Sequence, residues 1–164
     1  MGSSQTILVI DDELGARSAL QAILEGGHSV KLFSLGSDAI DFVRGNPEVA
    51  HAAFVDFTMP ELNGAAVCRS LTSVDPALSL IGITGNVAAD FQVPLFATIE
   101  KRGIAIGRVR EITERLQRYA AYRGRVQHGR LSSGEVGLRR HSRLRNHAGT
   151  PMWYSRSGQF WCFA

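Results

Sequence analysis

The strongest constraint on the fold is a set of short apolar runs, each of which leads into a charged or hydroxyl-bearing residue. Continuous apolar runs of this kind are typical of strands buried on both faces of a parallel sheet. Because parallel strands end at one edge of their sheet, the polar residues would meet there, and open α/β sheets form their sites at that edge. The runs are residues 7–10 before Asp11 and Asp12, 52–55 before Asp56, 80–83 before Thr84, and 95–99 shortly before Lys101.

Between these runs the apolar residues recur at helical spacing, so strands and helices are predicted to alternate. Gly26 and Gly27 end the first predicted helix, and Gly45, Asn46 and Pro47 end the second. The alternation predicts an α/β fold, a doubly wound five-stranded parallel sheet with five helices, of which the fourth is short. We expect strands at 6–10, 30–33, 52–55, 78–83 and 95–99, a fourth helix of about two turns within 85–94, and a fifth from 104 to 122–124.

The 164 residues suit one domain plus an extension, with hydrophobic (45%) and charged (20%) content that is ordinary for a globular protein. No apolar stretch is long enough to span a membrane, and the N-terminus lacks the charged and apolar regions of a signal peptide. Cys68 and Cys162 lie far apart and have no metal-binding spacing, which favours reduced thiols. We therefore expect a cytoplasmic protein with no membrane partner.

The net charge of +3 hides an asymmetry along the chain. Residues 1–118 hold ten Lys and Arg against fourteen Asp and Glu, a balance of −4. Residues 119–164 hold eight Arg, no Lys and one acid, Glu135, a balance of +7. The isoelectric point of about 9.2 therefore comes from the C-terminal segment. We divide the chain into a domain at 1–122 and a basic, aromatic-ended tail at 123–164, for which we expect irregular structure.

The predicted sheet edge has a definite chemistry. Clustered carboxylates form the hard oxygen site that Mg²⁺ prefers, and a carboxylate in such a cluster can attack phosphorus. The chain has neither a G-x-G-x-x-G sequence after its first predicted strand nor a G-K-[ST] phosphate loop. The sequence therefore argues against a dinucleotide or nucleoside-triphosphate site.

Four motifs, in this order on this repeat, resemble the receiver domain of two-component response regulators over residues 5–120. The resemblance implies a flavodoxin-like fold, Mg²⁺ as cofactor, and a bacterial protein that accepts a phosphoryl group from a histidine kinase or histidine phosphotransfer protein. Gly64, at the end of the second motif, is expected to supply a turn with positive φ. The motifs are Ile-Leu-Val-Ile-Asp-Asp-Glu at 7–13, Val-Asp-Phe-Thr-Met-Pro-Glu-Leu-Asn-Gly at 55–64, Ile-Thr-Gly at 83–85 and Ile-Glu-Lys at 99–101.

The resemblance also implies a role for each matching position. Asp56 is the expected phospho-acceptor. Lys101 would pair with a phosphoryl oxygen, and Thr84 would supply the switch hydroxyl that hydrogen-bonds to the phosphoryl group. Because phosphoryl transfer depends mainly on positioning and charge stabilisation, these groups suffice. The implied magnesium ligands are Asp11, partly through water, Asp12, Asp56 and the backbone carbonyl of Thr58.

Each of these residues also has a purely structural interpretation. Asp11 and Asp12 could simply begin a helix, because acidic residues are favoured in the first turn. Asp56 could belong to the turn before Met59 and Pro60, Thr84 could cap the following helix, and Lys101 could be solvated.

Three departures from the family pattern concern the readout of phosphorylation. Arg102 and Gly103 follow Lys101, where the family usually has a proline, and Thr98 stands where it often has a Tyr or Phe that moves with the switch hydroxyl. The stretch from Thr84 to Lys101 is shorter than usual, so the face made by the fourth helix, fifth strand and fifth helix would be unusual. We expect phosphorylation chemistry to persist while the conformational readout differs.

These observations predict a stand-alone receiver that signals by protein–protein contact, with a homodimer left open. It would not be an enzyme beyond catalysing its own phosphoryl transfer and dephosphorylation. The alternative is a pseudo-receiver, a constitutive interaction module without a phosphorylation cycle, which Thr98 and Arg102 favour. A flavodoxin-like enzyme with a small-molecule site is disfavoured, because no phosphate-cradling loop opens the first helix.

The tail has three interpretations, because it contains no recognisable helix-turn-helix output module. It could be a disordered or weakly docking extension, or non-functional sequence such as a shifted reading frame. It could also bind nucleic acid through phosphate contacts from arginine and stacking on Trp and Tyr. We expect no nucleic-acid partner outside this tail.

Overall fold

The computed structural model describes residues 5–60, 62–85, 93, 95–102 and 104–127, together with three C-terminal segments at 139–145, 151–154 and 160–162. The chain separates into two compact units, residues 1–118 and 119–164. Among the described residues, no helix combines the length and the apolar character needed to cross a membrane.

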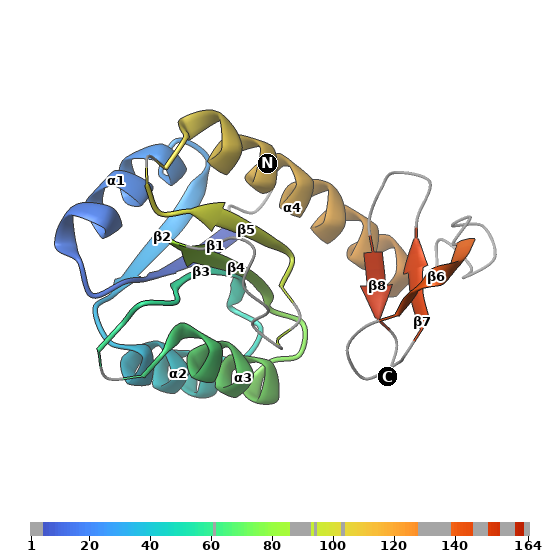
Figure 1. Cartoon of the computed structure of the whole chain (residues 1–164), viewed down its shortest axis with the longest axis horizontal. Coiled ribbons are helices and arrows are strands. Elements are labelled where there is room, and N and C mark those ends of the chain that lie inside the picture. Colours follow the sequence, from blue (N-terminus) through green and yellow to red (C-terminus); the bar gives the residue numbers. More distant parts are fainter. Residues whose placement is uncertain are drawn as a thin grey trace. The chain divides into compact units, whose positions relative to one another are not determined.

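The first unit is built on five parallel strands in the order β2-β1-β3-β4-β5 (Figure 1). The chain therefore starts inside the sheet, winds outward to β2, crosses back to β3 and continues to β5. This order confirms the predicted doubly wound parallel sheet. The strands are β1 (Gln5–Ile10), β2 (His28–Phe33), β3 (Ala50–Asp56), β4 (Ser79–Thr84) and β5 (Ala97–Glu100).

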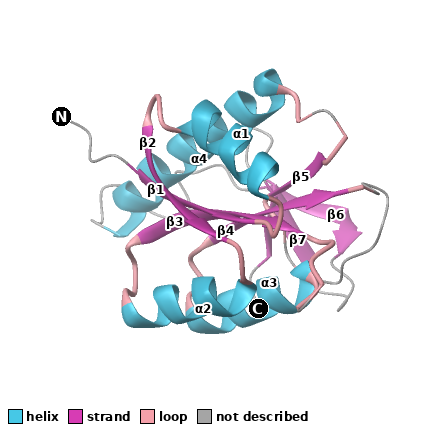
Figure 2. Cartoon of the chain, turned by 90° about the vertical axis from the view of Figure 1, so that its left-hand side faces the viewer, coloured by secondary structure: helices cyan, strands magenta, loops and turns pink. Residues whose placement is uncertain are grey.

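Helices cover both faces of this sheet. The described helices are α1 (Leu14–Leu24), α2 (Gly36–Gly45), α3 (Gly64–Val74) and α4 (Ile106–Gln127). Helices α2 and α3 lie on one face of the sheet, and α1 and α4 lie on the other (Figure 2). The short helix predicted within 85–94 falls mostly outside the described residues. Helix α4 is the fifth helix of the prediction, and it continues past the expected end at 122–124.

Two hydrophobic cores hold the layers together, and strand alternation divides the side chains between them. In β1, Leu8 and Ile10 belong to the core under α2 and α3, whereas Ile7 and Val9 belong to the core under α1 and α4. Phe54 of β3 is fully buried in the second core. A fully buried side chain of this size stabilises the fold by about 1.5–3 kcal/mol. The two cores thus hold the central strands from both faces of the sheet. They also fix the position of the strand ends.

The second unit contains a small antiparallel sheet in the order β6-β7-β8. Its strands are β6 (Arg139–Arg145), β7 (Pro151–Tyr154) and β8 (Phe160–Cys162). The expectation of irregular structure for the tail is therefore wrong for these segments. Aromatic residues favour strands, and the strands pair Trp153 with Trp161 and Tyr154 with Phe160. These segments are too short for an alternation of apolar and polar residues to predict them as strands from the sequence.

Candidate functional site

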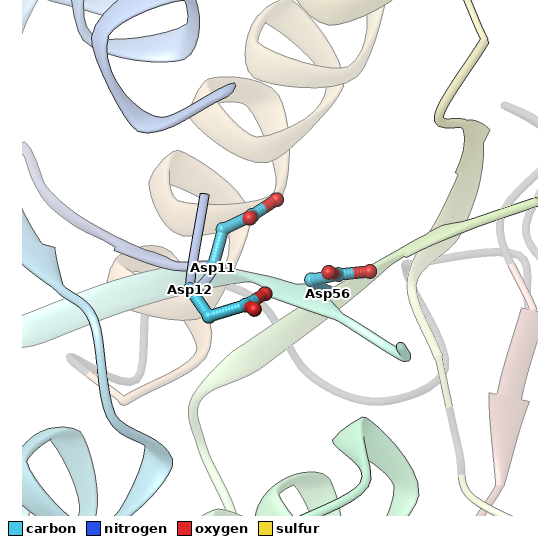
Figure 3. A group of neighbouring side chains, drawn as sticks. All are labelled: Asp11, Asp12 and Asp56. Atoms are coloured by element: carbon cyan, nitrogen blue, oxygen red, sulfur yellow. The ribbon is translucent and has the colours of Figure 1, made fainter. Parts of the chain in front are cut away.

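Three carboxylates lie together where β1 and β3 end (Figure 3). Asp56 is the last residue of β3, and Asp11 and Asp12 follow directly after β1, its neighbour in the sheet. Each carboxylate offers one oxygen that lies within 4.8 Å of the oxygens offered by the other two. Asp11 and Asp56 are fully buried, whereas Asp12 is exposed. The sheet thus brings together the three acids that the sequence singled out.

The backbone around Asp11 fixes its carboxylate inside the cluster. The Asp11 amide donates to the carbonyl of Phe33 on β2 (3.2 Å), and the amide of Glu13 donates to Asp11 Oδ1 (2.8 Å). Asp11 Oδ2 is buried and accepts no hydrogen bond from the described residues. Burial raises the pKa of Asp11, the bond from Glu13 opposes this, and the charges of Asp56 and Asp12 add to the rise. The positive charge of Lys101 lowers the pKa of Asp11 but does not outweigh burial.

Both oxygens of Asp56 have defined partners. The amide of Thr58 donates to Oδ1 (3.0 Å), and the ammonium of Lys101 donates to Oδ2 (2.7 Å). Gly64, the first residue of α3, packs against the same loop, because a Cβ there would lie 2.6 Å from the Cα of Phe57 and closer still to the Asp56 carbonyl oxygen. Gly64 is thus needed for close approach. The expected positive φ at this residue is wrong.

Lys101 bridges the carboxylates from the end of β5. Its amide donates to the carbonyl of Thr84 (2.9 Å), which holds the backbone beside β4. Its Nζ lies 2.7 Å from Asp56 and 3.5 Å from both Asp11 and Glu13. Burial lowers the pKa of Lys101, but the hydrogen bond to Asp56 and the negative charges of Asp11 and Asp56 outweigh burial and raise the pKa to about 12. Lys101 is therefore charged at any physiological pH.

The donor set fits a small hard cation such as Mg²⁺. Carboxylate oxygens from three residues converge, and one of them, Asp11 Oδ2, is buried without a hydrogen bond. Lys101 pairs with two of the three clustered acids, Asp11 and Asp56, so the cluster keeps a negative charge that a divalent cation would neutralise. Mg²⁺ binds oxygen ligands and retains several waters, which suits a site with one exposed side.

The structure shows where Thr84 and Thr58 lie, but their predicted roles stay predictions. Thr84 ends β4, is 4% exposed, and contributes its carbonyl to the Lys101 backbone. Its hydroxyl as the phosphoryl switch stays a prediction. Thr58 contacts Asp56 through its amide, and the role of its carbonyl as a metal ligand also stays a prediction.

Sequence reasoning assigned no role to Arg17, which supports the acidic loop. Its Nη1 donates to the carbonyl of Asp11 (2.6 Å), and its own amide donates to the carbonyl of Glu13 (3.1 Å). Arg17 is half-buried one helical turn beyond Glu13. The four-residue spacing between Glu13 and Arg17 could have predicted this contact, because a side chain one turn into a helix points back toward the start of the helix.

Thr98 and Arg102, the two residues near Lys101 that depart from the family pattern, lie in a strand and at the surface. Thr98 lies in β5 opposite Gly82 of β4, and Arg102 is exposed. The aromatic residue of this strand region, Phe96, lies beneath the guanidinium of Arg115 on α4, 5.1 Å from its carbon to the ring centre. Phe96 is thus held from the α4 side, away from the register position that Thr98 occupies.

Solved structures place the fold in a known class, the flavodoxin-like receiver folds. A response regulator receiver domain protein from Clostridium thermocellum is similar, with a TM-score of 0.63, 22% identity, and coverage of 72% of this chain and 98% of that one. A CheY-like receiver domain protein from Methanospirillum hungatei has a TM-score of 0.64 and 20% identity, with coverage of 73% and 99%. At these identities the likeness establishes the fold.

The sequence narrows this class to one family. A family profile for the response regulator receiver domain matches residues 7–117 of the chain. The chain belongs to the response regulator receiver domain family.

Curated relatives agree with this family and are longer proteins. Response regulator MprA from Mycobacterium sp. strain KMS is 38% identical over 82 residues, which cover 49% of this chain and 34% of that protein. The transcriptional regulatory protein ZraR from Escherichia coli K12 is 30% identical over 93 residues, 56% of this chain and 21% of that protein. The match thus spans about a third of the first relative and about a fifth of the second.

Proposed function

We propose that the first unit accepts a phosphoryl group on Asp56 in a magnesium-dependent phosphorelay. One observation carries this proposal: Asp56 is a fully buried carboxylate that lies 2.7 Å from a permanent cation and beside two further carboxylates. Membership of the receiver family supports it. A buried nucleophile with a fixed counter-charge is the arrangement that phosphoryl transfer requires.

The proposed step exchanges one bond to phosphorus for another. An oxygen of Asp56 forms a P–O bond while the P–N bond of a phosphohistidine breaks, and the imidazole nitrogen leaves with the electron pair and is protonated by water. The products are an aspartyl phosphate and a free histidine. Lys101 is placed to stabilise charge on the phosphoryl oxygens, because its Nζ already lies against Asp56.

A bound Mg²⁺ would neutralise repulsion between the carboxylates and the incoming phosphoryl oxygens. Asp11, Asp12 and Asp56 would hold it, since their oxygens converge and one of them has no hydrogen bond. The chain's own contribution is position: Arg17 and the Glu13 amide fix the loop that carries the acids. The Thr58 amide orients Asp56 from the other side.

The phosphodonor in this proposal is a histidine kinase or histidine phosphotransfer protein. Three exposed apolar residues support a docking protein, because each follows one of the loops that bear the site. Leu14 (67% exposed) follows the acidic pair, Leu62 (39%) follows Asp56, and Ile106 (53%) follows Lys101. Exposed large apolar side chains can serve as anchors for a protein partner.

The proposal has further parts beyond the phosphoryl transfer itself. The proposal also includes output through protein–protein contact, a cytoplasmic location and a bacterial source. The two curated relatives named above, from Mycobacterium and Escherichia coli, support the bacterial source. Turnover would be limited to the chain's own aspartyl phosphate, so it would not be an enzyme for other substrates. The stand-alone arrangement and a homodimer stay predictions.

The test is intact-mass spectrometry of the full chain after incubation with acetyl phosphate and Mg²⁺. Wild type is expected to gain one phosphoryl adduct, and Asp56→Asn is expected to gain none. Asp75→Asn is the matched control, because Asp75 is also buried and its Asn replacement keeps an oxygen for the Ala77 amide. An adduct on Asp56→Asn would show that another residue is the acceptor.

A pseudo-receiver is the second candidate, and Thr98 in β5 is the observation that favours it. Absence of an adduct with acetyl phosphate, with phosphoramidate and with a promiscuous kinase would support this candidate. Amide NMR shifts around Asp12 and Asp56 during a Mg²⁺ titration provide the companion measurement. A receiver with a phosphorylation cycle should show saturable shifts at both residues.

A further inference from the structure

The residue directly after the proposed phospho-acceptor is a half-buried aromatic, Phe57, and the phosphoryl transfer described above gives it no role. We propose that Phe57 is a positioning residue, which orients the Asp56 carboxylate for phosphoryl transfer by fixing the backbone between Asp56 and Thr58. This inference rests on the proposed function, because it concerns the same acceptor.

Two elements hold the backbone of Phe57. Its amide donates a hydrogen bond to the carbonyl of Ile83 on β4 (2.9 Å). In addition, Gly64 at the start of α3 approaches so closely that a Cβ there would lie 2.6 Å from the Cα of Phe57. Strand β4 and helix α3 therefore fix the residue after the acceptor, and neither contact involves the carboxylate of Asp56 itself.

The ring of Phe57 fills the space above Gly82 of β4. A Cβ at Gly82 would lie 2.8 Å from Cε2 of the ring and 3.1 Å from Cδ1 of Leu95. Phe57 and Leu95 both pack against the core under α2 and α3. Any side chain at position 82 would therefore take the place of the ring. Because packed interiors leave little free space, the ring cannot shift without displacing its neighbours.

These contacts act on Asp56 through the next peptide group. The amide of Thr58, which follows Phe57, donates to Asp56 Oδ1 (3.0 Å), and the ammonium of Lys101 donates to Oδ2. A rotation of the Phe57 backbone would turn the Thr58 amide away from Oδ1, and a hydrogen bond weakens steeply when its angle departs from linear. The carboxylate would then lose one of the two bonds that orient it. The ring over Gly82 therefore helps to set the direction of the attacking oxygen, although it belongs to a different residue.

The first experiment exchanges volume between the ring and Gly82. Gly82→Ala adds the Cβ that collides with the ring, and Phe57→Leu removes the ring. Each change should slow phosphoryl incorporation from acetyl phosphate at saturating Mg²⁺ by up to about 100-fold, the loss that a displacement of roughly 1 Å can cause. The double variant, which combines the added Cβ with the smaller side chain, should react faster than either single variant, because residues in contact have non-additive effects.

Two matched controls separate positioning from stability. Phe42→Leu also removes a ring that packs against the core under α2 and α3, but Phe42 lies on α2 and pairs with Phe33. Gly107→Ala adds a Cβ on α4 that meets nothing within 4 Å. Urea unfolding of all variants measures their stability. Both controls should incorporate the phosphoryl group at the wild-type rate, and Phe42→Leu should do so even though it is less stable.

Hydrogen exchange of the Thr58 amide reports the positioning itself and needs no phosphorylation. Phe57→Leu and Gly82→Ala should lose protection at Thr58, whereas the Glu13 amide, which donates to Asp11 Oδ1, should keep its protection. A wild-type protein without an adduct would contradict the proposed function, and the exchange at Thr58 would still test the role of Phe57. Three results would overturn the inference: wild-type rates in both single variants, a double variant no faster than the single ones, or unchanged protection at Thr58.

Discussion

The ammonium of Lys101 lies 2.7 Å from Asp56 Oδ2, so the residue proposed to receive the phosphoryl group is already neutralised by the cation proposed to stabilise it. The same ammonium lies 3.5 Å from Asp11. One positive charge therefore serves two fully buried carboxylates, and an incoming phosphoryl group must share it. The positive charge of Lys101 should therefore oppose Mg²⁺ binding but favour phosphoryl transfer.

Replacement of Lys101 should separate these two demands. Lys101→Met removes the charge and keeps the length, so Mg²⁺ should bind at least as tightly to the more negative cluster. Phosphoryl incorporation should fall by about 10²–10³-fold, the usual loss for one charge-stabilising group. Lys101→Arg, which keeps the charge, should retain more activity. Mg²⁺ titration by NMR and the rate of adduct formation check the two effects, and parallel loss of both in Lys101→Met would contradict the separation.

Asp12→Asn should stabilise the metal-free protein. Asp12 is exposed and lies within 4.8 Å of two buried carboxylates, so its negative charge is repelled by both. Removing it should raise the free energy of unfolding by up to about 1 kcal/mol. The stabilisation that Mg²⁺ gives to wild type should also shrink. Urea unfolding with and without Mg²⁺ measures both, with the exposed Asp41→Asn as control, and a destabilised Asp12→Asn would argue against repulsion.

Gly64→Ala should destabilise the first unit. Its new Cβ would collide with the backbone of Asp56 and Phe57, which cannot rotate away as a flexible side chain would. Such overpacking costs about 1–3 kcal/mol. Gly15→Ala is the matched control, because a Cβ at Gly15 meets nothing within 4 Å. This control lies inside α1 and should be stabilised by about 0.5–1 kcal/mol, so equal unfolding midpoints for the two variants would contradict the geometric argument.

The sequence contained enough information to predict most of the first unit. Asp11, Asp56 and Thr84 could be placed at one edge because apolar runs identify buried strands and parallel strands share their ends. The partners of these residues were harder to predict. The bond from Arg17 to Asp11 depends on a rotamer, and the need for glycine at position 64 depends on how closely α3 approaches β3. The β6-β7-β8 sheet was missed because its pairing is set by register between segments that carry no periodic pattern.

Stability of the first unit should fall below about pH 6.5 because of His28. Burial lowers the pKa of His28, and the neighbouring positive charge of His51 lowers it further. The unfolded chain therefore binds a proton at a higher pH than the folded chain does. This contribution to stability is present above the unfolded pKa and is lost as pH falls through the lowered folded value. Urea unfolding between pH 7.5 and 5 should show a smaller slope for His28→Gln, and identical slopes would exclude His28 as the source.

Leu14→Gln should slow transfer from a protein phosphodonor and spare transfer from a small one. Leu14 is 67% exposed directly beyond the acidic loop, so a docking protein can bury it whereas acetyl phosphate does not need it. Loss of an apolar anchor costs about 1–2 kcal/mol at a protein interface, a five- to thirtyfold lower rate from a histidine phosphotransfer protein. Val49→Gln is the matched control, because Val49 is 42% exposed just before β3, at the opposite end of that strand from Asp56. Equal slowing with acetyl phosphate would mean that Leu14 supports the site itself, and unchanged rates with both donors would place docking elsewhere on the surface.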